Sequence, residues 1–166
     1  MTRSDETAYI ELIDTGDLAS LQSPGFPYML KKLVAEAYLI RGGISIDSWF
    51  RSGYAQKLIL KETGWETDKS PWFQKMPNRF KSSRAAVLSR MKKEGDIYRE
   101  GFFTPAEVDL YGYLLVSLLE SRTNEKQLDS ALGSMRGGLD LNETLSTVGK
   151  VDLKRLEADF FATLRK

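Results

Sequence analysis

The 166-residue chain contains neither cysteine nor histidine. Without cysteine it has no disulfide framework, no thiol nucleophile and no thiolate metal site. Without histidine it lacks the commonest general base and metal ligand. These absences exclude His-dependent triads, thiol enzymes and nearly all zinc sites. Carboxylate, lysine, serine or tyrosine chemistry would need a convergent cluster, which no spacing in the sequence indicates. We therefore expect no catalytic residue, no metal site and no cofactor.

Long apolar runs are also absent. No window approaches 18 uninterrupted apolar residues, and the opening MTRSDETAYI has an acidic pair but no apolar core of a signal peptide. We therefore predict a cytoplasmic protein with no membrane partner. Hydrophobic residues make up 42% of the chain, which is enough for a core that folds without covalent staples.

The net charge of +1 conceals an uneven distribution. Residues 1–24 carry one basic and five acidic residues, and residues 104–166 carry eight basic and ten acidic ones. Residues 25–103 carry fifteen basic and eight acidic residues, so the positive charge belongs to the middle of the chain. A local basic patch, more than the charge of the whole chain, is what attracts nucleic acid.

The first half of the chain predicts an arm, two helices and a short strand. Residues 1–27 are acidic and end in the breaker SPGFP, which indicates a partly ordered arm. Helical spacing of apolar residues predicts helices over 28–40 and from Asp47 or Ser48 to about Lys61. The β-branched run 44–46 between them suits a small strand.

Residues 62–77 are too long for the three- or four-residue link of a helix-turn-helix. We expect Ser70 to cap a short helix over 71–76, followed by a turn at Pro77 and Asn78. Aromatic residues in this stretch favour core or hinge packing, with stacking on single-stranded bases as an alternative. These aromatic residues are Trp65, Trp72 and Phe73.

Residues 78–104 read as a basic helix, a glycine and a hairpin. Apolar residues share one face of the helix, and small or basic residues share the other. The apolar set is Phe80, Val87, Leu88 and Met91. Gly95 ends the helix after Lys92 and Lys93. The runs 96–99 and 102–104, hinged at Glu100 and Gly101, predict a β-hairpin.

The succession from Leu88 through Glu94-Gly95 and Arg99-Glu100-Gly101 to Thr104 resembles the C-terminal half of a winged helix-turn-helix domain. The resemblance covers residues 28–104 and implies a DNA-binding transcriptional regulator or DNA-organising factor. It implies a recognition helix over 79–94 and a wing over 96–104.

The outward residues of the helix are short enough to approach bases, or basic enough to meet phosphates, and Arg99 lies near the wing tip. The candidate DNA-binding residues are Arg79, Lys81, Ser82, Ser83, Ala86, Ser89, Arg90, Lys93 and Arg99. Arg84 projects toward the apolar side in this arrangement, so we expect it to pair or snorkel.

A strong helix start follows, with Thr104 as cap, Pro105 first and Glu107 at the capping-box position. The helix to about Arg122 has an apolar surface wide enough to need cover on two sides. The winged-helix body can cover one side. The other side is covered either by the remaining C-terminal helices or by a second copy of the chain, and we expect a homodimer through this helix. Weaker helices are predicted over 125–135 and 139–148, and a last one begins after Asp152.

The sequence thus predicts a mainly α protein with a small β-hairpin. Its parts are the arm 1–27, a winged-helix-like domain 28–104 and a C-terminal helical region 105–166 that packs or dimerises. The expected partner is double-stranded DNA. The alternative is a non-enzymatic protein-interaction or assembly module built on the same scaffold, since a fold does not by itself define a function. A basic helix face that is merely solvated is also compatible with the pattern.

Overall fold

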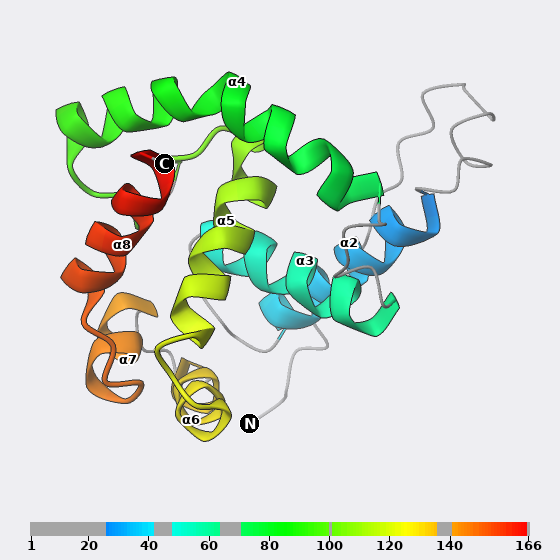
Figure 1. Ribbon diagram of the computed structural model, residues 1–166. Helices are drawn as coiled ribbons and strands as arrows, with labels where there is room; N and C mark the ends of the chain where they lie inside the picture. The colour runs from blue at the N-terminus through cyan, green and yellow to red at the C-terminus, as the bar shows by residue number, and fades with distance from the viewer. Residues whose placement is uncertain (1–25, 42–47, 64–70, 100, 136–140, 166) are drawn as a thin grey trace.

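The computed structural model describes residues 26–41, 48–63, 71–99, 101–135 and 141–165. These residues form seven α-helices and contain no strand, so the described chain is all-α. The helices, numbered as in Figure 1, are α2 (Phe26–Arg41), α3 (Ser48–Thr63), α4 (Pro71–Glu94), α5 (Pro105–Glu120), α6 (Glu125–Met135), α7 (Leu141–Thr147) and α8 (Leu153–Arg165).

Helix α5 runs through the middle of the molecule (Figure 1), with α3 against it on one side and α8 and α4 on others. Its predicted start is confirmed, because Thr104 is the N-cap, Pro105 opens the helix and the Glu107 carboxylate accepts the Thr104 N–H at 2.9 Å. Its inward residues are fully buried within the chain. They include Leu110, Tyr111, Leu115, Val116 and Leu119. Val108, Leu114 and Leu118 of α5 pack against the core but remain partly exposed, so most of its apolar surface is covered within the chain. The homodimer expected through this helix stays a prediction.

Helices α3 and α5 cross at two glycines. A Cβ on Gly53 would overlap the carbonyl group of Gly112 and lie 2.8 Å from the Tyr113 nitrogen. A Cβ on Gly112 would likewise overlap the Trp49 carbonyl oxygen. The two backbones thus touch directly, and Trp49 and Phe50 fill the core beside this crossing.

An aromatic cluster joins the C-terminal helix to the middle of the chain. The Tyr111 ring stacks on Phe103 at 5.5 Å and meets Phe160 of α8 and Phe80 of α4 edge-on, at 6.0 Å and 5.3 Å. Phe103 also contacts Phe160 at 6.0 Å. Residues on both sides of position 104, where the sequence suggested a boundary, therefore share one core.

Helix α2 packs on α3 and is held by a partly buried ionic cluster. The Lys32 ammonium lies 2.9 Å from Glu36 and 2.7 Å from Asp109 of α5, and it donates to the Ser52 hydroxyl at 3.1 Å. Only 14% of the Lys32 side chain is exposed. Burial alone would lower the pKa of Lys32, but Asp109 and Glu36 outweigh burial and raise it.

The predicted wing is wrong for the residues that the structure describes. Residues 95–99 and 101–104 form turns and bends and contain no strand. Ile97 and Tyr98 are neighbours and both are buried, as are Phe102 and Phe103, whereas a strand would send neighbours to opposite faces. Gly95 and Gly101 adopt left-handed backbone with φ of 77° and 75°, and the Tyr98 N–H binds the Asp96 carboxylate in a tight turn. The segment is a packed loop. The small strand expected at 44–46 lies outside the described residues.

The expected break at Pro77 is also wrong, because α4 continues from Pro71 to Glu94 with Pro77 inside it. A proline in a helix removes one hydrogen bond and typically costs about 3 kcal/mol. Met76 on one side of Pro77 and Phe80 on the other both pack against the core. Burial of apolar side chains on both sides of the proline favours a continuous helix over the turn.

Candidate nucleic-acid interface

Helix α4 lies on the outside of the molecule, spanning the top of the view above α5 and α8 (Figure 1). Its inward face carries the residues that hold it in place. Val87 and Met91 are buried, and Met76 and Phe80 pack against the core. The opposite face is exposed along most of the helix.

The outward face is basic. The exposed cations of α4 are Lys75, Lys81, Lys92 and Lys93 on this face and Arg84 at its margin, three residues before the buried Val87. None of them makes an ion pair with another residue in the described part of the chain. The one acidic residue of α4 is its last, Glu94, and that carboxylate is bound by Arg99. Nothing on this helix therefore neutralises the five cations, which we call the α4 cation set.

Small side chains form a stripe between these cations. Ser82, Ala85, Ala86 and Ser89 are exposed and follow the spacing i, i+3, i+4, i+7, so they share one side of the helix. At 1.5 Å per residue, the distance along the helix from Lys75 to Lys93 is roughly 27 Å. The outward face thus combines a low central stripe with positive charge at both ends and along both edges.

Of the nine residues predicted to contact DNA, five lie exposed on this face of α4. They are Lys81, Ser82, Ala86, Ser89 and Lys93. The Ser82 hydroxyl donates to the Arg79 carbonyl of its own helix at 3.0 Å. The side chains of the other four make contacts that join different segments of the chain. They are Arg79, Ser83, Arg90 and Arg99.

The engaged residues hold α4 and the loop after it in place. Arg79 donates to the Ala106 carbonyl at 2.8 Å, and the Ser83 hydroxyl lies 2.7 Å from the Tyr111 hydroxyl. Arg99 pairs with Glu94. Each of these contacts joins α4 to α5 or to the packed loop. Arg79, Ser83 and Arg99 therefore hold α4 against α5 and against the loop that follows α4.

Arg90 is the most deeply engaged of the four. Its guanidinium donates two parallel hydrogen bonds to the Glu107 carboxylate, both 2.9 Å long, and a further one to the Phe102 carbonyl. Only 20% of the Arg90 side chain and 10% of the Glu107 side chain are exposed. Burial alone would raise the pKa of the Glu107 carboxyl, but hydrogen bonds from Arg90 and the Thr104 N–H outweigh burial and lower it. Arg90 therefore ties α4 to the start of α5.

Sequence reasoning missed three cations of this face. Lys75 was placed before the expected break at Pro77, and only a continuous helix brings it into line with Lys93. Arg84 was expected to turn toward the apolar side and to pair or snorkel. It lies three residues before the buried Val87, and its side chain is exposed. Lys92 was assigned only to the C-terminal turn. The charge excess of the segment was the available signal for all three.

The described residues contain no group of three or more histidine, cysteine, aspartate or glutamate side chains placed to hold a metal ion. None of the helices in the described ranges is both long and apolar enough to cross a bilayer. The side chains of Trp72 and Phe73, and all of Trp65, lie outside the part of the chain that the structure describes.

No protein-family model matches this chain, and neither a curated protein nor a solved structure does.

Proposed function

We propose that this protein binds double-stranded DNA through the outward face of α4, as a transcriptional regulator or a DNA-organising factor. The observation that supports this proposal is the α4 cation set, which no acidic side chain in the described part of the chain neutralises. Clustered unpaired cations on one helix face are the electrostatic footprint of phosphate binding.

The shape of α4 suits the same partner. A helix with its side chains is about 10–12 Å across, and the major groove of B-DNA is about 12 Å wide. The stripe of Ser82, Ala85, Ala86 and Ser89 lets the helix approach the base edges closely. Lysines and an arginine on its two flanks are long enough to reach phosphates on either side of the groove. In this proposal the cations supply affinity and the serine hydroxyls contact base edges.

This mode of binding does not use a wing. The buried side chains of residues 97, 98, 102 and 103 anchor the described part of the loop to the body. Arg99 of that loop is bound by Glu94. Of the features that resemble a winged helix-turn-helix domain, only α4 takes part in the proposed DNA contact.

The test is fluorescence anisotropy with a labelled 20-base-pair duplex and its single strand, over salt concentrations of about 50–200 mM. Five phosphate contacts would give a log-log salt slope of about −4.5 on duplex. Changing Lys81 and Lys93 together to glutamine should reduce the slope by about 1.8. The matched control changes two exposed lysines away from α4, Lys126 and Lys150, to glutamine and should leave the slope unchanged. Absence of duplex binding at the lowest salt, or equal slopes for both double variants, would refute the proposal.

A protein-interaction module is the second candidate, and α2 is the observation that favours it. Met29, Val34, Tyr38 and Ile40 on this helix are exposed, with Tyr38 67% accessible. A helix that is apolar on most sides normally lies buried. Most of the apolar surface of α5 is covered within the chain, so in this second candidate we place the homodimer contact on α2 and not on α5, where the sequence predicted it. Light scattering after size exclusion should then give twice the monomer mass, which Tyr38→Glu should halve. A monomeric mass would rule out a homodimer through α2.

A further inference from the structure

A cavity of about 370 Å³ opens between α3 and the junction of α5 with α6, separate from the outward face of α4. It is lined by Tyr54, Lys57, Leu58, Lys61, Glu120, Thr123, Asn124 and Leu128. Its volume equals the space of roughly a dozen water molecules and falls at the lower end of the range for small-molecule sites. The ligand that fits is therefore a small one.

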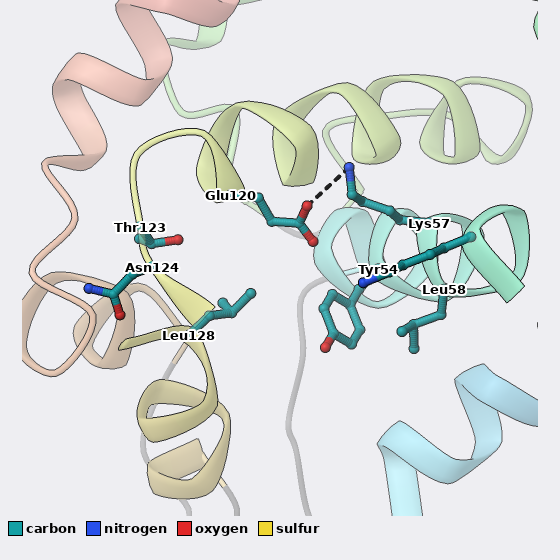
Figure 2. Close-up of a pocket in the computed structure, with 8 residues that line it drawn as sticks. Tyr54, Lys57, Leu58, Glu120, Thr123, Asn124 and Leu128 are labelled. Carbon is teal, nitrogen blue, oxygen red and sulfur yellow. Dashed lines mark ion pairs between the residues drawn. The ribbon is translucent and has the colours of Figure 1, made fainter. Parts of the chain in front are cut away.

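One part of the cavity wall is apolar. Figure 2 shows Leu128 of α6 facing Tyr54 and Leu58 of α3 across the opening. Leu128 is buried, whereas Leu58 remains 40% exposed although it is a large apolar side chain. A ligand with an apolar body would cover Leu58 and fill the gap between these side chains.

The charges that line the cavity are not balanced. The Lys57 ammonium lies 3.0 Å from the Glu120 carboxylate, and the two neutralise each other across the opening (Figure 2). Lys57 also lies over the Tyr113 ring, 5.5 Å from its centre. Lys61, one helical turn beyond Lys57, is exposed and forms no ion pair with another described residue. Two lysines against one glutamate leave a single positive charge on the wall.

We propose that this cavity binds a small amphipathic monoanion, an aromatic or aliphatic carboxylate. The apolar body lies between Tyr54, Leu58 and Leu128, and the carboxylate meets Lys61. A dianion is disfavoured because Lys57 is already paired with the Glu120 carboxylate, which leaves only Lys61 to meet a negative charge on the ligand. The site lies between α3, the end of α5 and α6, apart from the DNA-binding face proposed for α4.

Isothermal titration calorimetry of the full chain with 2-naphthoate, phenylacetate and hexanoate tests the proposal, and 2-naphthamide serves as the uncharged match of the first. We expect one 2-naphthoate per chain, and about fivefold weaker binding of the amide, as a single partly exposed ion pair contributes. Lys61→Met should reduce 2-naphthoate affinity to that of the amide. The control Lys126→Met, on α6 but outside the cavity, should leave affinity unchanged.

Filling the cavity tests its location. Leu128→Trp should abolish binding, and Leu58→Trp, at a partly exposed position that a larger side chain can occupy without disturbing the core, should do the same. Far-UV circular dichroism identifies a variant that fails to fold. Binding that survives in a folded tryptophan variant would overturn the cavity as the site. Equal affinity for the acid and the amide would overturn the role of Lys61, and no binding of any of the three acids at millimolar concentration would overturn the proposal as a whole.

Discussion

Gly53 of α3 and Gly112 of α5 lie backbone against backbone, and neither position has room for a Cβ. We predict that Gly53→Ala and Gly112→Ala each lower the free energy of unfolding by about 2 kcal/mol, because the helices must separate to admit the methyl group. This loss runs against the intrinsic preference of about 1 kcal/mol for alanine in a helix. Urea unfolding followed by circular dichroism measures the change.

The control for this prediction is Gly133 of α6, where a Cβ would meet nothing within 4 Å. Gly133→Ala should stabilise the protein by about 0.5–1 kcal/mol through helix propensity and the reduced freedom of the unfolded chain. Similar effects at Gly112 and Gly133 would show that the close crossing does not exist in solution.

Arg90 provides a second prediction, because it stabilises the structure and does not face outward with the α4 cation set. Arg90→Met leaves the Glu107 carboxylate partly buried without its partner and should cost about 3 kcal/mol. Lys93→Met, on the exposed face, should change stability by less than about 0.5 kcal/mol. Thermal or urea unfolding of the two variants measures the contrast. Equal stability losses would contradict the assignment of Arg90 to the α4–α5 contact.

Acid sensitivity is a third prediction. The pKa of Glu107 is lowered from its ordinary value of 4.5 in the folded protein, so the folded state binds the proton less readily than the unfolded state. The stability from this carboxylate is therefore fully present above about pH 4.5 and is lost as pH falls through the folded pKa. Urea unfolding from pH 7 to pH 3 should show this loss, and Glu107→Gln should make the profile flatter below pH 4.5. An identical slope in both proteins would rule out this linkage.

A fourth prediction concerns how α2 is held. Lys32→Met leaves Glu36 and Asp109 without their shared cation, so amide hydrogen exchange in α2 should become faster than in α5. The control is Lys31→Met, since Lys31 pairs with Glu62 on an exposed surface and such pairs contribute about 0–1 kcal/mol. Equal rates of amide exchange in α2 of the two variants would contradict the role of Lys32 and would show that apolar packing holds α2 on α3.

The features predicted correctly from the sequence are those determined by neighbouring residues. Thr104, Pro105 and Glu107 define the start of α5 because capping involves residues within one turn. The basic character of α4 could likewise be predicted, because its basic residues all lie in one continuous segment of the sequence. The predicted DNA contacts at Lys81, Ser82, Ala86, Ser89 and Lys93 remain a prediction, and the structure shows that these side chains are exposed.

The features missed depend on partners distant in the sequence. Arg90 was assigned to the outward face because its carboxylate partner, Glu107, is seventeen positions further along. The apolar pairs of the loop 95–104 resembled a hairpin, but the core formed by α5 and α8 buries both members of each pair. At Pro77, local chemistry indicated a turn and packing on either side of it produced a helix. In each case a tertiary contact overrode a local preference.

The outward face of α4 has no described role in holding the fold together. The residues on this face can therefore be constrained by a binding partner without being constrained by folding. Selection of random variants for folding alone should tolerate almost any polar residue at Lys75, Lys81, Arg84, Lys92 and Lys93. Selection for a cellular activity would retain positive charge there only if an anionic partner requires it. How freely these five positions accept substitutions under selection for activity therefore reports what a partner requires, separately from what folding requires.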